Sequence, residues 1–413
     1  MIDIKFIKNY FFILFSIIPI SIVVGPAISL INIIIIDISF IFYVILRKDF
    51  KFLKNSTIKI ILAIYIYLIF NSFISLDSQI GLNRNLGFIR FIIFFICFNY
   101  FFYLDKKFKK IFIYWILAVL IICLDVYLES FKGTNLLGYG GQEYGRRIVS
   151  FFKDEPIAGA YINGFFLILI SFWLLHYKSN SLYQNLSFLI FVSLIFFSII
   201  LTGERSNSIK AFIGLILFFF FVKEFTFKTK IVSFLSIGIL FTFIYINSDF
   251  LKLRYGWQII YQITKQEKIE NFYKNDLYFK IYRSGYSVFK NYPYFGVGNK
   301  NYRVETCDTT KINKDYICTT HPHQIYFEFL SEHGLLGSLF LISAIFLLMF
   351  KNFKIFFKLR NPMQIGSFIY LIIIFLPLLP SGSFFHDFNL TLFWLNMSIF
   401  YGLSTQTNIF SKK

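Results

Sequence analysis

Apolar stretches long enough to cross a lipid bilayer recur along the whole of this 413-residue chain. About 20 apolar residues in a helix span a hydrocarbon core of about 30 Å, and unbroken runs argue against transmembrane strands. With 57% hydrophobic residues and a mean hydropathy of +0.66, the sequence predicts a single-domain, all-α polytopic membrane protein over 1–413. About twelve transmembrane helices are expected, at 10–24, 27–46, 58–75, 87–104, 111–128, 157–176, 186–201, 208–222, 231–247, 324–350, 364–380 and 390–403.

Lysine and arginine give the chain a net charge of +19 and gather in short loops. Because these clusters recur at every second loop, they follow the positive-inside pattern of membrane helices. We therefore expect these loops and both termini in the cytoplasm, and the charge requires no nucleic-acid partner. The clusters are Lys5/Lys8, Arg47–Lys54, Lys106–Lys110, Lys223–Lys230, Lys351–Arg360 and Lys412/Lys413.

Two longer polar segments, 129–156 and 248–322, fall on the outer side of this topology, which makes them a smaller and a large periplasmic loop in a bacterium. In the large loop, apolar residues at near-helical spacing predict an amphipathic helix over 271–292 that lies against the membrane surface. Pro293, Gly296 and Gly298 are expected to end it. The apolar residues of this helix are Phe272, Leu277, Ile281, Tyr282 and Val288.

Cys307 and Cys318 share the large outer loop, whereas Cys97 and Cys123 fall inside predicted spans. An outer compartment is oxidising, which favours a disulfide between the two loop cysteines. Spacing alone does not establish pairing geometry, so two free thiols remain the alternative.

The stretch HPHQIYFEFLSEHGLLG, from His321 to Gly337, is unusually polar for a segment that leads into a span. Thr320 or His321 is expected to cap a helix with Pro322 in its first turn, which places His323 in that turn as well. A helix N-terminus disfavours imidazolium, so His323 is a candidate neutral general base at the outer membrane boundary. The alternative for a single histidine is an ordinary interfacial side chain.

Arginine is unexpectedly frequent at the outer ends of the predicted helices, where the positive-inside pattern predicts few basic residues. Any one of these arginines can pair with lipid head groups, but the group indicates an anionic ligand, and planar guanidinium groups suit phosphate oxygens. Arg205, in the short turn LTGERSNS, is held close to the outer surface. The other members are Arg84, Arg90, Arg146, Arg147, Arg254, Arg283 and Arg303.

The histidines and carboxylates of the outer segments do not have the ligand spacing of a zinc site. We therefore expect chemistry without a metal or another cofactor, in which arginines supply the positive charge. Backbone amides of GVGNKNYR, residues 296–303, are a weaker candidate for anion binding. The residues considered as ligands are His321, His323, His333, Asp154, Glu155, Glu328 and Glu332.

Several separated motifs follow one another between about Arg146 and Gly337. His323-Gln324 is followed by nine residues and then by Gly-Leu-Leu-Gly; Arg205 stands in TGERS; Arg283 precedes PYFGVG; and RRIVSFFKDEPIAGAY opens an apolar segment. In this order, with one large late outer loop, the motifs resemble the O-antigen ligase family and its relatives among bacterial O-antigen and surface-polysaccharide polymerases. The first spans match the family only as hydrophobic segments.

The resemblance implies a glycosyltransferase of lipopolysaccharide biosynthesis in the bacterial inner membrane, with its active site facing the periplasm. The implied donor is a glycan on undecaprenyl diphosphate, whose tail lies among Phe-rich helices and membrane lipids, and the implied acceptor is lipid A-core. Arg205 and Arg283 are then expected to hold the diphosphate and His323 to act as general base, with His321 as the rival base. The further expected substrate-binding residues are Arg146, Arg147, Glu204, Arg303, His321 and Gln324.

Two other functions remain as alternatives. A polymerase, which joins one lipid-linked glycan to another, needs the same diphosphate clamp and the same base, so the sequence does not separate it from a ligase. A transporter of the lipid-linked sugar draws support from Asp37, an ionisable residue in the middle of a predicted span. Against transport, the polar residues gather at the outer face.

Overall fold

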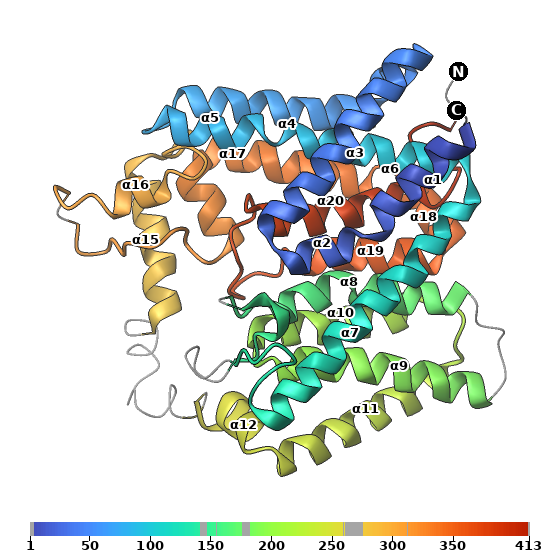
Figure 1. Ribbon diagram of the computed structural model, residues 1–413. Coiled ribbons are helices and arrows are strands. Elements are labelled where there is room, and N and C mark those ends of the chain that lie inside the picture. Colours follow the sequence, from blue (N-terminus) through green and yellow to red (C-terminus); the bar gives the residue numbers. More distant parts are fainter. Residues whose placement is uncertain are drawn as a thin grey trace.

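The computed structural model describes residues 4–140, 147–153, 155–175, 182–258, 260, 276–311 and 313–411, and within these ranges it contains helices and no strand (Figure 1). Its first half comprises α1 Ile4–Ser16, α2 Ile18–Val24, α3 Pro26–Arg47, η1 Lys51–Lys54, α4 Ser56–Phe73, α5 Ser78–Leu86, α6 Ile89–Leu104, η2 Lys106–Lys110, α7 Ile111–Lys132, η4 Ser150–Phe152, α8 Ala158–Leu175 and α9 Leu182–Leu201. Its second half comprises α10 Arg205–Phe221, α11 Phe227–Asn247, α12 Asp249–Leu251, η5 Lys252–Trp257, α15 Leu277–Asn291, α16 Tyr302–Thr306, α17 Ile325–Phe350, α18 Phe353–Leu359, α19 Pro362–Ile373 and α20 Asp387–Gly402.

The predicted all-α polytopic class is confirmed. Eight helical segments of the described chain are long and apolar enough to cross a membrane, and a ninth appears if α1 and α2, bent by 44°, form one span. A helix also occupies each of the other expected segments, but α10, α19 and α20 have only 17, 12 and 16 residues. The predicted number of twelve spans is therefore not confirmed.

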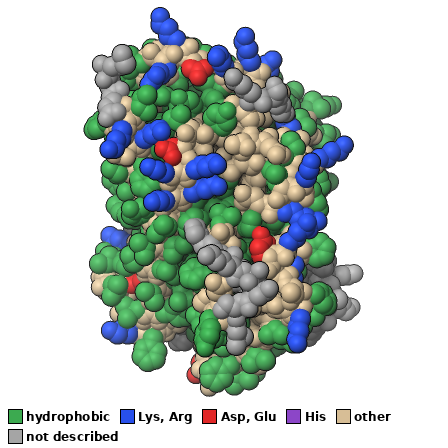
Figure 2. All heavy atoms as spheres, turned by 90° about the vertical axis from the view of Figure 1, so that its right-hand side faces the viewer, with side chains coloured by type: hydrophobic (Ala, Val, Ile, Leu, Met, Phe, Trp, Pro, Cys, Tyr) green, Lys and Arg blue, Asp and Glu red, His purple; other side chains and the backbone are tan. Residues whose placement is uncertain are grey.

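The face that carries the two chain ends is rich in lysine and arginine and poor in acidic side chains (Figure 2). The basic clusters Lys106–Lys110 and Lys351–Arg360 follow the C-terminal ends of α6 and α17. Helix α10 likewise ends just before Lys223. Helices α10 and α17 therefore begin at the opposite face, which we call the outer face.

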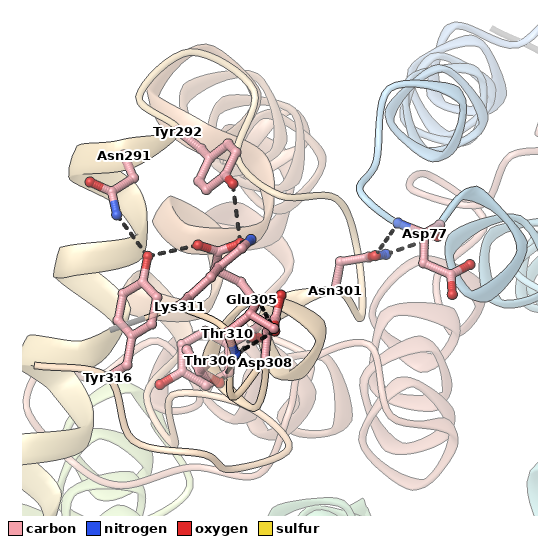
Figure 3. Close-up of polar contacts among 11 residues, drawn as sticks. Asp77, Asn291, Tyr292, Asn301, Glu305, Thr306, Asp308, Thr310, Lys311 and Tyr316 are labelled. Carbon is pink, nitrogen blue, oxygen red and sulfur yellow. Dashed lines mark hydrogen bonds and ion pairs between the residues drawn. The ribbon is translucent and has the colours of Figure 1, made fainter. Parts of the chain in front are cut away.

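Residues 276–311 and 313–320 fold over the outer face, and we call them the outer cap (Figure 1). Its centre is Glu305, only 3% exposed, whose carboxylate accepts hydrogen bonds from the Tyr292 and Tyr316 hydroxyls at 3.1 and 2.8 Å and pairs with Lys311 (Figure 3). The Asn301 side chain accepts a hydrogen bond from the Asp77 backbone N–H at 2.7 Å. The cap is thus fastened to the connection between α4 and α5.

A disulfide joins Cys307 to Cys318 in the outer cap, with their Cα atoms 4.5 Å apart. Both cysteines are exposed, and the bridge closes the segment that leads directly to the histidine stretch. Cys97 and Cys123 are buried free thiols, as expected for cysteines inside spans.

The predicted amphipathic helix is α15, which starts at Leu277 with the Asp276 side chain capping its N-terminus; residues 271–275, with Phe272, lie outside the described residues. Its buried face packs on protein: the Tyr282 ring stacks on Phe327 at 5.3 Å, and Gly285 lies against Pro322 and Phe327. The prediction that its apolar face lies against the membrane surface is therefore wrong for the buried part. A polar helix with one apolar stripe fits either surface, and sequence does not distinguish them.

Helix α17 begins at Ile325, three residues after Pro322, which was expected in its first turn, and this corrects the placement of His323 in that turn. The side chain of Gln324 caps the helix by accepting hydrogen bonds from the N–H groups of Tyr326 and Phe327, at 2.8 and 3.1 Å. His323 precedes the cap and has a left-handed backbone, with φ of 54°. Glutamine is an unusual cap, so the sequence pointed to Thr320 or His321 instead.

Helix α17 is broken at Gly334, whose φ and ψ are 64° and −169°. The PYFGVG segment fills the break. Leu335 and Leu336 donate backbone hydrogen bonds to the carbonyls of Pro293 and Tyr294, at 2.7 and 3.1 Å. Val297 and Gly298 donate to the carbonyls of Ser331 and Glu332, both at 2.9 Å. The backbone amides of Val297 and Gly298 already donate hydrogen bonds within the protein. The expectation that GVGNKNYR binds an anion through its amides is therefore wrong at these two positions.

Replacing Gly334 with Ala is expected to destabilise the protein by about 2–4 kcal/mol, because an added Cβ would collide with the backbone of Tyr294 and Phe295 at a φ that side chains avoid. Thermal unfolding in detergent measures this as a lower midpoint. Gly238→Ala is the matched control, because Gly238 lies inside α11 with no atom within 4 Å of an added Cβ. Equal midpoints for the two variants would contradict the rigid pairing of α17 with PYFGVG.

Helix α11 is the least buried candidate span: 11% of its apolar window is buried, against 39% or more for every other candidate. It leads through α12 into η5, and a side chain at Gly256 of η5 would collide with the Tyr245 hydroxyl of α11. Helix α11 and η5 are therefore in direct contact at Tyr245 and Gly256.

Candidate functional site

A cavity of about 620 Å³ opens at the outer face, where α8, α10 and α17 begin and α19 ends. Side chains from distant parts of the chain line it: the segment before α8, the first turns of α10, the π-helix η5, the first turn of α15 and the histidine stretch. The segment from Tyr370 to Leu392 completes the wall. The cavity therefore lies at the opposite end of these helices from the basic face.

Four cations and one carboxylate line the cavity among the described residues: Arg147, Arg205, Lys210, Arg254 and Glu204. Arg205 donates to Gln258 Oε1 at 2.5 Å, and Arg254 donates to the same oxygen at 2.9 Å. A single amide oxygen thus holds two guanidinium groups together. Burial, followed by the nearby Arg147 and Arg205, lowers the pKa of Arg254 to about 10, so Arg254 stays charged at neutral pH. This excess of positive charge favours an anion.

Glu204 connects the cavity to the N-terminus of α8. Its carboxylate accepts hydrogen bonds from the Gly159 N–H at 2.6 Å and from the Asn207 side chain at 2.7 Å. Burial raises the pKa of Glu204 to about 7, against the opposing effect of these hydrogen bonds and of Arg147. The charge of the cavity therefore changes near neutral pH.

His323 lines the cavity, whereas His321 is not among the residues that line it. The two rings are 4.0 Å apart, and Tyr278 of α15 approaches His323 edge-on. A carbonyl only accepts hydrogen bonds, so His321 Nε2 donates to Ser381 at 3.3 Å and its Nδ1 accepts from the Thr320 hydroxyl at 2.9 Å. Both nitrogens of His321 are occupied. Of the two candidate bases, His323 is the one that faces the cavity.

Burial, followed by the neighbouring His321 and opposed by Glu328, lowers the pKa of His323 to about 4. Burial also lowers the pKa of His321 to about 4. Both imidazoles are therefore neutral at physiological pH. His323 is thus neutral, as predicted. The cause is its burial in the cavity wall and not the helix N-terminus, because His323 lies outside α17.

The loop 380–384 connects the part of the cavity wall that contains Arg205 to the part that contains His323. Ser206, next to Arg205, donates to the Pro380 carbonyl at 2.5 Å, and the Ser381 N–H donates to the His323 carbonyl at 2.8 Å. The buried Glu328 fixes this loop by accepting hydrogen bonds from the Ser383 hydroxyl at 2.6 Å and the Phe384 N–H at 2.9 Å. Glu328 acts on the site through this loop.

The structure brings four of the predicted site residues to the cavity: His323, Arg205, Glu204 and Arg147. Arg283 and Arg303 are exposed on α15 and α16 and are not among the residues that line it. Gln324 is 2% exposed, and its side-chain oxygen caps α17. Arg146 lies outside the described residues, as does Asp154 among the carboxylates considered for metal binding.

Sequence reasoning gave no individual role to Arg254, Gln258 or the loop 380–384. Arg254 was recognisable as one of the outer arginines, but no motif marked it. Gln258 and the loop carry no signal in the sequence, because their importance arises from segments that meet only in the fold. Within the described ranges, no three histidine, cysteine or acidic side chains cluster closely enough to hold a metal ion.

Residues 189–342 match the family model described as O-Antigen ligase. The matched segment includes Arg205, Arg254 and His323, and it leaves out Arg147 and the loop 380–384. No curated protein matches the chain.

Proposed function

We propose that this chain, of which residues 189–342 match the O-Antigen ligase family model, transfers an O-antigen-type glycan from undecaprenyl diphosphate to lipid A-core. The reaction takes place at the periplasmic face of the bacterial inner membrane. One observation carries the proposal: three guanidinium groups and a neutral imidazole line the same outer cavity. Positive charge suits the diphosphate of the donor, and neutral imidazole suits a base.

The diphosphate of the donor binds to the arginine cluster. Arg205 and Arg254, held together by Gln258, form a pair of guanidinium groups for phosphate oxygens, and Arg147 adds a third positive charge. The polyprenyl tail extends into the surrounding membrane. Arg283 is exposed on α15, the helix that sends Tyr278 into the cavity. We retain Arg283 as a further donor contact, along with Arg303.

His323 removes the proton from the acceptor hydroxyl while the resulting oxygen attacks the anomeric carbon of the donor glycan. The bond between that carbon and the diphosphate breaks, and its electron pair leaves with the diphosphate. Arg205 and Arg254 stabilise the charge that develops on the leaving group. Attack opposite to the leaving group inverts the anomeric carbon. The donor is already activated, so arginines supply the positive charge of the step without a metal.

Two alternative functions share features of this site. A polymerase uses the same donor and base and differs only in taking a second lipid-linked glycan as acceptor. A transporter draws on Asp37, which is 3% exposed in α3 and whose carboxylate oxygens have no hydrogen-bond partner among the described residues. Asp37 does not line the cavity that contains His323.

The test is transfer by purified protein reconstituted in liposomes. The donor is undecaprenyl-diphosphate-linked glycan, offered with lipid A-core or with a second donor molecule as acceptor, with and without a chelator. Glycan on lipid A-core in both conditions is the expected result. Chain growth on the second donor would identify a polymerase, loss of transfer with chelator would contradict the metal-free mechanism, and absence of both products would refute the enzyme.

The KM for the donor is expected to fall by up to about fivefold as pH drops from 8 to 6. Below pH 7 Glu204 is protonated, since its pKa is about 7, so the cavity loses its one described carboxylate charge and attracts the diphosphate more strongly. His323 stays neutral over this range because its pKa is about 4. Initial rates at several pH values measure the effect.

Glu204→Gln is the control for this pH dependence. The amide keeps the shape of the side chain but does not titrate, so the variant should show a low donor KM at every pH. A wild-type KM that rises as pH falls, or a variant that keeps the wild-type slope, would show that Glu204 does not set the donor affinity.

A further inference from the structure

A second cavity of about 580 Å³ opens beside the first. It lies between the α2–α3 turn, the first turn of α6, the η4 segment and the first turn of α20. Ile157 lines both cavities. In α20, Asp387 and Thr391 face the second cavity, whereas Asn389 and Leu392 face the first. The two cavities therefore adjoin at Ile157 and the start of α20.

The second cavity has balanced charge, unlike the first. Among the described residues its cations are Arg90 and Lys153 and its carboxylates are Glu155 and Asp387, whereas the first cavity has four cations and one carboxylate. Asp387 is paired with Arg90 and, at 2.7 Å, with Arg84. A second diphosphate would find little net positive charge here. Cationic hydrogen-bond donors next to anionic hydrogen-bond acceptors suit a neutral ligand group with many hydroxyls.

The Arg90 side chain is 15% exposed, and its Nε atom is buried without a hydrogen-bond partner among the described residues. A buried donor without a partner costs stability unless a ligand or water satisfies it. Arg90 therefore offers an unused donor beside the cavity wall. Tyr139 and Phe151 add aromatic surface next to these polar groups.

The opposite side of the cavity is apolar and reaches exposed apolar side chains of α2 and α3. Val24 and Leu30, from the α2–α3 turn and α3, line it, and Val24 is 64% exposed. Ile28, between them in the chain, is 45% exposed. A ligand with a sugar at one end and a hydrocarbon chain at the other matches a cavity that is polar and aromatic on one side and apolar on the side toward lipid.

We propose that this second cavity binds the acceptor glycolipid, a proposal that rests on the glycosyl transfer inferred above. The acceptor sugar lies among Arg90, Lys153, Glu155 and the aromatic rings, and its hydrocarbon part lies along the α2–α3 wall. The acceptor hydroxyl reaches His323 past Ile157 and the start of α20. The donor and acceptor thus approach the reaction from separate cavities, which keeps the acceptor out of the arginine cluster.

Ser29→Trp tests the proposal, because Ser29 lines the second cavity and an indole would fill part of it. Ile31→Trp is the matched control, since Ile31 lies on the same helix and is 50% exposed. The KM for the acceptor is expected to rise at least tenfold in Ser29→Trp and to stay within twofold of wild type in Ile31→Trp. Binding of undecaprenyl diphosphate should be unchanged in both variants. A thermal midpoint equal to wild type verifies folding.

Lys153→Ala provides a second variant on an exposed side chain, and it should also raise the acceptor KM while leaving the binding of undecaprenyl diphosphate unchanged. An unchanged acceptor KM in Ser29→Trp, or loss of undecaprenyl diphosphate binding, would overturn the second cavity as an acceptor site. If wild-type protein transfers glycan to no acceptor, the proposed function fails by itself. Direct binding of lipid A-core to wild type and Ser29→Trp then tests the cavity: equal binding rejects it.

Discussion

Replacing His323 with Ala is expected to lower kcat for glycan transfer by about 100- to 10,000-fold, because the acceptor hydroxyl then loses its general base. Binding of undecaprenyl diphosphate should remain, since Gln258 holds Arg205 and Arg254 in place. Radiolabelled glycan transferred to acceptor measures kcat, and the thermal midpoint checks the fold. His321→Ala should cost less, because His321 acts only by holding the histidine loop to Ser381 and Thr320.

The pH dependence of kcat/KM separates His323 from Glu204 as the base. A base must be unprotonated, so activity is present above its pKa and is lost as pH falls through it. With a pKa of about 4, His323 keeps kcat/KM high down to about pH 5, whereas Glu204 as the base would cause a loss near pH 7. A fall near pH 7, together with a His323→Ala variant of nearly normal kcat, would assign the base to Glu204.

Arg205→Ala and Arg254→Ala are each expected to lower kcat/KM by about 10- to 150-fold, the value of a charge-assisted hydrogen bond of about 1.5–3 kcal/mol to the diphosphate. Arg205→Lys should recover only part of the loss, because lysine keeps the charge and loses the planar pair of donors. Steady-state kinetics with varied donor measures both effects. Lys252→Ala is the matched control, since Lys252 is a cation of η5 that pairs with Asp249 and does not line the cavity.

The double variant Arg205→Ala/Arg254→Ala tests whether the two arginines act together. Both donate to Gln258 Oε1, so removing one changes the position of the other. Residues that share a partner do not contribute additively, and the double variant should lose less than the product of the two single losses. Full additivity would mean that Gln258 does not couple them.

The sequence was sufficient to predict the helical segments, because the length and apolarity of a segment determine whether it can cross a bilayer. It was also sufficient to group Arg205, Glu204 and His323 at one outer surface, since the basic loops fixed the direction of each helix. It was not sufficient for the start of α17. The cap at Gln324 and the left-handed backbone of His323 depend on the loop 380–384, which lies far away in the chain.

Tertiary contacts also explain the residues that the sequence left without a role. Arg254 reaches the cavity only because the π-helix η5 folds against the Gly203 turn, where Arg254 donates to the Gly203 carbonyl at 2.8 Å. The break at Gly334 needs the PYFGVG segment to satisfy its freed amides. Hydrophobic periodicity reports which side of a helix is buried, but it does not report which distant loop covers that side.

The sparse burial of α11 links the chemistry to the thickness of the surrounding bilayer. Little of this helix is buried in the protein, and its Tyr245 contacts Gly256 of η5, the π-helix that carries Arg254 and is followed by Gln258. A helix adapts to a thinner bilayer by tilting, which displaces its ends sideways. A change in the acyl-chain length of the lipids would therefore shift Arg254 relative to Arg205. The lipid composition would then affect the turnover rate.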